Sequence, residues 1–235
     1  MARKMICFLI ALVTALTVTA AADDMPEPEK IIYLTFDDGP GTYTGQLLDI
    51  LKRYDVKATF FLVNTGVDMD TLLQRMVEEG HSLGIHSYSH DFKTIYSSDE
   101  AFMEDLYAMQ RTIFEKCGVL TNLLRFPGGG SNTVSRRYCY GIMSRITKRV
   151  GEEGFVYFDW NVDSGDAYGC PDPDVIYQKV ICGIKGKDRA VVLQHDVNGC
   201  SVKTVERIIL WGQKNGYVFR ALTEQSPGCR HRVQN

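Results

Sequence analysis

Two groups of residues in this sequence have the types and spacing to do chemistry on a bound substrate. Asp37 and Asp38 are adjacent and follow the first apolar segment of the predicted fold, and His86 and His90 stand four positions apart. Two imidazoles at this spacing fall on one side of a helical turn, which is how proteins present two nitrogens to a divalent metal. Adjacent side chains on extended backbone point in opposite directions, so one carboxylate can bind a metal while the other faces substrate.

Together these side chains predict a catalytic metal site. Two histidines and one carboxylate leave coordination positions open, which is typical of catalytic rather than structural sites. Either Asp38 or Asp37 is a suitable third ligand. A metal held in this way lowers the pKa of a bound water towards about 7 and polarises a carbonyl group. Of the other histidines, His81 is expected to be structural, and no role is assigned to His231.

Ionisable groups also follow three later segments that are predicted to be strands. Arg125 precedes a glycine-rich turn, Asp163 and Asp166 follow the fifth predicted strand, and His195 follows the sixth. Taken alone, Arg125 could form a surface salt bridge, Asp163 could belong to a polar turn, and His195 could be a buried structural histidine. These separate explanations do not account for ionisable groups at five strand ends. Parallel α/β architectures carry their active sites at the carboxyl ends of the strands. The sequence therefore predicts one site assembled from all five.

Short apolar segments alternate with amphipathic segments along nearly the whole chain. The predicted strands are 31–36, 58–63, 82–86, 123–126, 155–162, 190–194 and 217–222. The predicted helices are 45–54, 69–79, 99–116, 137–151, 174–184 and 202–214. Such alternation indicates an α/β protein with right-handed crossovers and a mainly parallel sheet. Seven strands either close into a barrel or stay open and doubly wound, and periodicity does not decide between the two.

The N-terminus has the pattern of a secretory signal peptide. Arg3 and Lys4 precede an apolar run over 5–18, and the small residues at 20–22 offer a cleavage site. The run is shorter than the roughly 20 residues that a membrane span needs, although a retained anchor is the alternative. We expect a secreted or cell-wall-associated protein with no stable membrane anchor. The expected organisation is a signal peptide at 1–22, a short lead at 23–30, one domain at 31–223 and a tail at 224–235.

Composition and charge exclude several classes of protein. The chain has 235 residues, of which 45% are hydrophobic and 23% charged, as in an ordinary globular protein. There are 26 Lys and Arg against 29 Asp and Glu, so the net charge of −3 argues against a nucleic-acid partner. Removing residues 1–22 takes away two cations, which leaves 24 − 29 = −5. We expect a monomer whose partner is its substrate.

Six of the seven cysteines lie beyond the predicted signal peptide. An even number in an exported chain favours at least one disulfide, but the sequence does not choose the pairing. No two of the six stand at C-x-x-C spacing, which argues against a zinc site built from thiolates. The six are Cys117, Cys139, Cys170, Cys182, Cys200 and Cys229.

The five groups of residues occur in the same order as the motifs of a known enzyme family. From about residue 31 to residue 222 the chain resembles the polysaccharide deacetylases with a NodB homology domain, carbohydrate esterase family 4. The segments most specific to that family are Thr35–Pro40 (TFDDGP) and His86–His90 (HSYSH). The segments that are similar to its other three motifs are Arg125–Pro127, Asp163–Asp166 and Leu193–His195.

The resemblance implies a fold and a reaction. The fold is a single-domain distorted (β/α) barrel with about seven parallel strands, and the reaction is metal-dependent hydrolysis of an N-acetyl group on a glycan. Asp38, His86 and His90 would bind the metal, with zinc expected and cobalt or manganese as alternatives. Asp37 would be the general base, and His195 would be the general acid that protonates the departing amine.

The resemblance also implies residues that support this machinery. Arg125 would orient Asp37, and Asp166 would orient His195. A backbone N–H near Gly128 would help to stabilise the oxyanion, and Leu193 would line the pocket for the acetyl methyl group.

The chain departs from the family pattern at two places. Ala167 stands where the family has a tryptophan, so Tyr168 or Trp160 is expected to supply that pocket wall. The departure leaves Asp163 as an alternative to Asp166 for orienting the acid. Gly128 stands where the family often has an aromatic residue, which predicts a more open groove.

The expected substrate follows from location. An exported domain of this family meets the cell wall first, so N-acetylglucosamine of peptidoglycan is the leading expectation. Chitin oligomers, N-acetylmuramic acid and acetylxylan are alternatives that keep the chemistry. A glycan-binding module without turnover is an alternative of another class, and the intact acidic and histidine residues argue against it.

Overall fold

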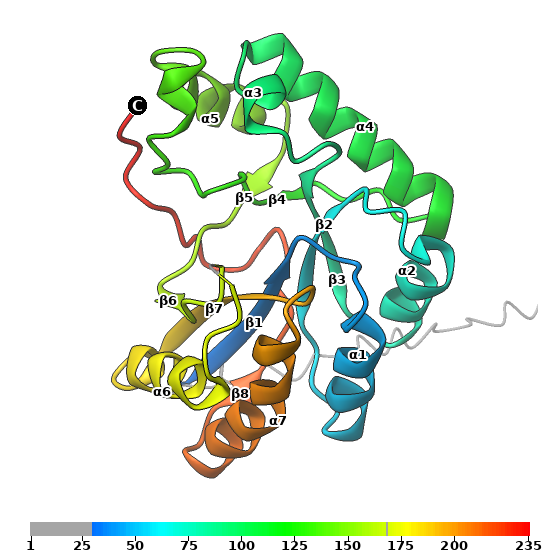
Figure 1. Ribbon diagram of the computed structural model, residues 1–235, viewed down its shortest axis with the longest axis vertical. Helices are drawn as coiled ribbons and strands as arrows, with labels where there is room; N and C mark the ends of the chain where they lie inside the picture. Colours follow the sequence, from blue (N-terminus) through cyan, green and yellow to red (C-terminus); the bar gives the residue numbers. More distant parts are fainter. Residues whose placement is uncertain (1–29, 168) are drawn as a thin grey trace, which may run out of the picture.

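Parallel strands form the centre of the molecule, and helices cover their outer face (Figure 1). The computed structural model describes residues 30–167 and 169–235, so the predicted signal peptide, nearly all of the predicted lead and Tyr168 lie outside the described residues. The strands are β1 (Ile31–Asp37), β2 (Thr59–Val63), β3 (Ser82–Ser87), β4 (Leu123–Leu124), β5 (Val156–Tyr157), β6 (Val162–Asp163), β7 (Arg189–His195) and β8 (Val218–Phe219). The helices are α1 (Thr44–Arg53), α2 (Met69–Glu78), α3 (Phe92–Ile95), α4 (Asp99–Cys117), α5 (Ile142–Glu152), α6 (Pro173–Ile184) and α7 (Gly199–Lys214), with a 3₁₀ turn at Ser135–Arg137.

The sheet is curled, and every strand pairing described in it is parallel. Its strand order is β5-β4-β3-β2-β1-β7-β6, and β8 pairs with the start of β1. β5 and β6 end the order and do not pair with each other, so the barrel is incomplete over the described residues. The predicted distorted (β/α) barrel with about seven parallel strands is confirmed.

Alternation along β1 explains how the sequence sends polar groups into the barrel. Ile32, Leu34 and Phe36 belong to the large apolar cluster between the sheet and the helices. Ile31 and Tyr33 belong to a smaller cluster inside the curl. Because side chains alternate between the faces of a strand, the inward series of β1 continues through Thr35 to Asp37.

Three predicted elements differ most in extent from the structure. The predicted strand 155–162 is two short strands. Between them, the carbonyls of Phe158 and Asp159 accept from Arg125 Nε (2.9 Å) and Arg125 Nη2 (3.0 Å) and not from a neighbouring strand. The predicted helix 137–151 starts at Ile142, after a glycine with φ of 73°. The strand predicted at 217–222 is paired only at Val218–Phe219.

A segment that we call the C-terminal strap, residues 229–235, runs along the open side of the barrel towards α5 (Figure 1). The carbonyl of Cys229 accepts from the N–H of Asp159 (2.7 Å), and the carbonyl of Asn235 accepts from the N–H of Ser144 (2.9 Å). The strap therefore contacts both the β5–β6 connection and α5.

A disulfide joins Cys170, before α6, to Cys200, in the first turn of α7. This bond agrees with the expectation of at least one bridge and supplies the pairing that the sequence did not decide. Cys117, Cys139, Cys182 and Cys229 are free thiols.

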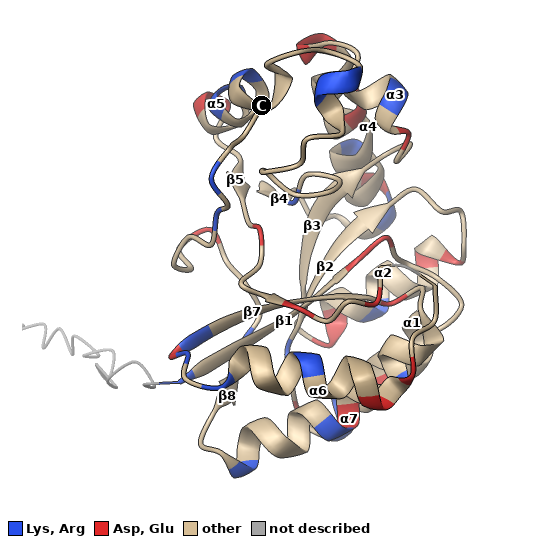
Figure 2. Cartoon of the chain, turned by 60° about the vertical axis from the view of Figure 1, so that its left-hand side comes forward, with Lys and Arg blue, Asp and Glu red and all other residues tan. Residues whose placement is uncertain are grey.

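Charged residues of both signs are interspersed over the helices and loops (Figure 2). This mixed distribution agrees with the small net charge of the sequence. In the described part of the chain, no helix is both long and apolar enough to cross a membrane.

Candidate active site

The carboxyl ends of the strands meet at one cavity of about 340 Å³. β1 ends at Asp37, which pairs in register with His195 at the end of β7, and β3 brings His86 to the same edge. The cavity is lined by Asp37, Asp38, His86, His90, Phe92, Gly128, Trp160, Asp163, Ala167, Leu193 and His195. Residues spread over more than half of the chain therefore meet in one place, as the strand-end pattern predicts.

Asp38, His86 and His90 form a cluster with the dimensions of a metal site. Asp38 Oδ1 lies 3.4 Å from His86 Nε2 and 3.3 Å from His90 Nε2. Ligand atoms bound at about 2.0–2.1 Å in a tetrahedral arrangement are about 3.3 Å apart. Asp38 Oδ1 is buried and has no hydrogen-bond partner among the described residues, which is costly for a carboxylate unless a cation accompanies it. The three side chains fit a divalent metal.

The two imidazoles are prepared to present a lone pair at Nε2. His86 Nδ1 donates to the carbonyl of Arg125 (2.8 Å), which leaves Nε2 unprotonated in the neutral ring. Burial, together with the nearby His86, lowers the pKa of His90 and favours its neutral form as well. Asp38 and His90 both have positive φ, 71° and 53°, an uncommon backbone that occurs often at functional sites.

The expectation that the two histidines share a helical turn is wrong. His86 lies inside β3, and His90 follows a turn that the side chains of Ser87 and Asp105 fix. Ser87 Oγ accepts from the N–H of His90 (2.8 Å) and donates to Asp105 Oδ1 (2.6 Å). Asp105 also accepts from the N–H groups of Tyr88 and Ser89 (2.8 Å each). The left-handed backbone at His90, not helical periodicity, brings the rings together.

Asp37 is held by a fully buried arginine. Arg125 Nη1 donates to Asp37 Oδ1 (2.8 Å) and to Thr35 Oγ1 (2.7 Å). The Arg125 guanidinium also lies over the Phe61 ring, 4.3 Å from its centroid. Nε and Nη2 donate to the carbonyls of the β5–β6 connection, so every nitrogen of the buried cation has a partner. Asp37 Oδ2 is left 3.9 Å from His86 Nε2, facing the metal cluster.

His195 and Asp166 form the second pair. His195 Nδ1 donates to Asp166 Oδ1 (2.7 Å), and the N–H of His195 donates to Asp166 Oδ2 (2.8 Å). Burial alone would lower the pKa of His195, but the hydrogen bond and charge of Asp166 outweigh it and raise the pKa to about 9. Burial would raise the pKa of Asp166, yet the His195 partner lowers it. His195 Nε2 lies 3.9 Å from Asp38 Oδ2, on the cavity side.

The structure places the two candidate orienting aspartates differently. Asp166 is buried and bonds to His195, whereas Asp163 is exposed and accepts from the N–H of Gly165 (2.7 Å) in its own turn. Of these two aspartates, Asp166 is the one that contacts the imidazole.

The cavity walls include one residue that sequence reasoning missed. Trp160, Gly128 and Leu193 line the cavity, and Phe92 lies beside Gly128, where an added Cβ would be 3.4 Å from its ring. Phe92 thus occupies space that an aromatic side chain at Gly128 would otherwise fill. No sequence pattern points to Phe92. The sequence does give a signal for Asp105, because it is a polar residue beside the apolar stripe of α4.

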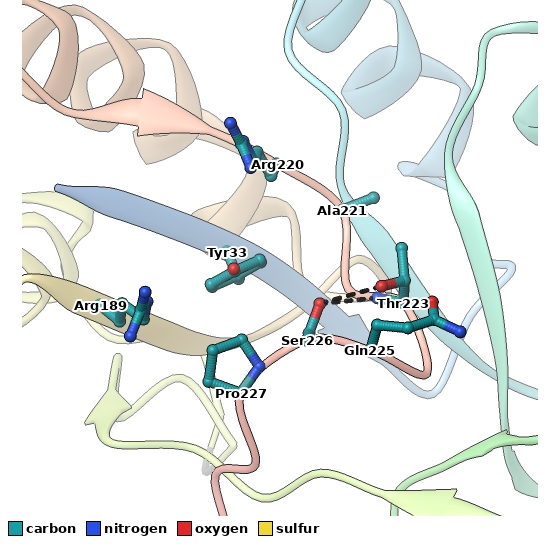
Figure 3. Close-up of a pocket in the computed structure, with 8 residues that line it drawn as sticks. All are labelled: Tyr33, Arg189, Arg220, Ala221, Thr223, Gln225, Ser226 and Pro227. Carbon is teal, nitrogen blue, oxygen red and sulfur yellow. Dashed lines mark hydrogen bonds between the residues drawn. The ribbon is translucent and has the colours of Figure 1, made fainter. Parts of the chain in front are cut away.

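A second cavity, of about 350 Å³, lies at the other end of the barrel (Figure 3). Arg189, which begins β7, and Arg220 lie on either side of Tyr33, and Ser226 Oγ accepts from the N–H of Thr223 (2.9 Å). The described residues that line this cavity include no carboxylate or imidazole. Among the described residues, the cluster whose side chains could hold a metal ion, Asp38, His86 and His90, therefore lies at the carboxyl ends of the strands.

A curled parallel barrel with an Asp-His-His cluster flanked by an Asp–Arg pair and a His–Asp pair defines a hydrolase of the polysaccharide deacetylase class. The sequence model described as polysaccharide deacetylase matches residues 24–140. A peptidoglycan-N-acetylglucosamine deacetylase of Bacillus cereus is 36% identical over 203 residues, 84% of this chain and 71% of that protein. The chain belongs to the polysaccharide deacetylase family, carbohydrate esterase family 4.

Two further relatives show how far the likeness extends. The peptidoglycan-N-acetylglucosamine deacetylase PgdA of Listeria monocytogenes is 33% identical over 83% of this chain, and the chain spans 38% of that longer protein. The crystal structure of the catalytic domain of a peptidoglycan N-acetylglucosamine deacetylase from Eubacterium rectale superposes with a TM-score of 0.87 at 49% identity. That match covers 92% of this chain and 99% of the other.

Proposed function

We propose that this chain is an exported, metal-dependent deacetylase that hydrolyses the acetamido group of N-acetylglucosamine in peptidoglycan. The observation that carries the proposal is the arrangement of two proton-transfer pairs around one metal cluster. Asp37 approaches the cluster at His86, and His195 approaches it at Asp38. Amide hydrolysis needs a base for the water and an acid for the nitrogen, and these two groups supply them.

Asp38, His86 and His90 would hold the metal, with zinc expected because the donor set is two nitrogens and one carboxylate oxygen. When bound, a divalent cation there polarises the acetyl carbonyl and makes a water molecule more acidic. The requirement for a metal, and its identity, are parts of the proposal that chelation tests.

Asp37 would accept a proton from the water that attacks the carbonyl carbon. Arg125 fixes the orientation of that carboxylate through the bond to Oδ1, which leaves Oδ2 for the proton. The backbone N–H of Gly128 would donate to the oxyanion, and Leu193 would contact the acetyl methyl group, since both line the cavity.

His195 would complete the reaction. Its pKa of about 9 keeps the imidazole protonated at neutral pH, and the bond to Asp166 leaves the Nε2 proton directed at the cavity. Transfer of this proton to the nitrogen lets the carbon–nitrogen bond break, which gives acetate and a free sugar amine. Before the next turnover Asp37 releases its proton to solvent and His195 takes one up.

Two observations support N-acetylglucosamine over N-acetylmuramic acid. The relatives named above are peptidoglycan-N-acetylglucosamine deacetylases. The described residues that line the cavity include aspartates but no lysine or arginine, so apart from His195 and the proposed metal, which serve the reaction, the lactyl carboxylate of an unsubstituted N-acetylmuramic acid would find no cation. The signal-peptide pattern at 1–22 supports export to the cell wall.

The test measures acetate released from purified peptidoglycan, with chitin oligomers, N-acetylmuramic acid glycans and acetylxylan in parallel. We expect release from peptidoglycan, loss of release with a chelator and recovery with added zinc. Asp37→Asn should abolish release, whereas Asp174→Asn, at an exposed carboxylate on α6, should not. Unchanged release by Asp37→Asn would overturn the assignment of the base. Binding of glycan without any release would favour a non-catalytic binding module.

A further inference from the structure

His231 on the C-terminal strap contacts both the backbone and the ring of the cavity wall residue Trp160. Its Nε2 donates to the carbonyl of Trp160 (2.7 Å) across 71 positions of the sequence. The two rings meet edge to face, with centroids 4.8 Å apart and planes at 75°. The remaining ring nitrogen, Nδ1, lies 3.2 Å from Ser131 Oγ, so both ring nitrogens have hydrogen-bond partners.

The contacts of His231 extend to the glycine turn that forms another part of the cavity. Asp159 Oδ2 accepts from the N–H of His231 (2.7 Å), while Asp159 Oδ1 accepts from the N–H of Gly130 (2.7 Å). A Cβ added at Gly129 would lie 2.9 Å from Trp160 Cη2, so the indole rests directly on the turn. The strap, the turn and the wall are therefore one connected unit.

Trp160 itself is a large ring at the edge of the reaction cavity. It lines the cavity together with Gly128 and Leu193, and it lies 5.7 Å from the guanidinium carbon of Arg125. An aromatic face commonly packs against the apolar side of a bound ring. Its contribution to affinity is larger when the aromatic side chain is already held in one orientation. His231 supplies that restraint and does not itself line the cavity.

We propose that His231 is a positioning residue for Trp160 and that the strap thereby sets the affinity of the site for an N-acetylated sugar. The proposal rests on the proposed deacetylase function. Because Trp160 would contact the sugar ring and has no group that transfers a proton in the reaction, its contact with the sugar acts equally before and during the chemical step. Loss of such a contact raises KM and leaves kcat nearly unchanged.

The experiment combines single and double variants in acetate-release assays on a soluble N-acetylglucosamine oligomer. His231→Ala should raise KM by about tenfold with kcat within about twofold of wild type. His231→Gln, whose amide can still donate to the Trp160 carbonyl, should recover most of the affinity. Trp160→Ala should raise KM at least as much, and the double variant should be no worse than Trp160→Ala alone, because the two residues act as a unit.

Arg232→Ala is the matched control, since Arg232 is the exposed neighbour on the same strap and should leave both constants unchanged. Additive effects in the double variant, or a kcat that falls as far as KM rises, would overturn the proposal. So would an unchanged KM in His231→Ala. If His231→Ala does not fold, the comparison of His231→Gln with His231→Asn tests the proposal instead. Gln places an amide nitrogen near the position of Nε2 and Asn places it near that of Nδ1, so only His231→Gln should keep the affinity.

A second measurement separates failure of this proposal from failure of the proposed function. The chain has two tryptophans, Trp160 and Trp211, so a Trp211→Phe background reports on Trp160 alone. His231→Ala in that background should make the fluorescence of Trp160 more accessible to acrylamide. Greater quenching with no acetate release from any glycan would refute the proposed function but keep the positioning role. Unchanged quenching would refute the positioning role.

Discussion

Replacing Asp166 by asparagine should move the alkaline limit of activity to lower pH. In the folded protein the pKa of His195 is about 9, although burial acts to lower it, because the hydrogen bond and charge of Asp166 raise it. The neutral amide of the variant cannot supply that charge, and burial opposes the smaller contributions of Asp37 and Asp38, so the pKa of His195 should fall to about its ordinary value of 6.5. Without a bound metal, the protonated fraction of His195 at pH 8 then drops from about nine-tenths to about one-thirtieth, roughly a 30-fold loss of the proposed general acid.

The assay is the pH profile of kcat for acetate release from pH 5 to 10 with a saturating divalent metal. A bound cation lowers the pKa of His195 in wild type and variant alike, so the comparison is the shift between the two alkaline limbs. We expect that limb to move by about 2 pH units or more. Asp163→Asn is the matched control, because Asp163 bonds within its own turn and should leave the limb in place.

Two results would refute this reasoning. An alkaline limb that stays in place in Asp166→Asn would mean that His195 is not the acid or that Asp166 does not set its protonation. A limb that moves in Asp163→Asn instead would assign the orienting role to the exposed aspartate.

Two further predictions concern stability. Burial lowers the pKa of His81 from 6.5 to about 4, so the unfolded chain binds a proton between those values that the folded chain does not. The free energy of unfolding should therefore fall by about 3 kcal/mol as pH drops from 6.5 to 4, and urea titrations of His81→Asn should show a shallower fall. The Cys170–Cys200 bridge spans 30 positions, so the double variant Cys170→Ser/Cys200→Ser should lose about 3–4 kcal/mol of unfolding free energy in denaturant titrations. If wild type were equally stable under oxidising and reducing conditions, this prediction would be wrong.

The sequence was informative wherever function follows from strand ends. β1 alternates apolar residues between two faces, so the inward position of Asp37 was implicit in the segment 31–37. The same geometry brings His86 and His195 to one edge of the sheet, because parallel strands end together. These placements need only local periodicity and parallel pairing.

Other parts of the site depend on contacts between segments far apart in the chain, which local patterns do not contain. The break in the predicted strand 155–162 exists because the side chain of Arg125, just after β4, takes its carbonyls. The approach of the two histidines depends on Asp105, which lies 18 positions from Ser87 on another element. His231 acts across 71 positions, so nothing near it in the sequence could indicate a role beside Trp160.

Arg125 connects three parts of the site that the sequence suggests as separate features. Its guanidinium orients Asp37, its own carbonyl fixes the ring of His86, and its remaining donors bend the connection that leads to Trp160. Because one buried cation contacts the proposed base, a proposed metal ligand and the connection to the cavity wall, a substitution there disturbs all three and leaves a buried carboxylate without its partner. The peripheral pairs, His195 with Asp166 and Trp160 with His231, are therefore where the proposed proton transfer and the proposed sugar binding can be changed one at a time.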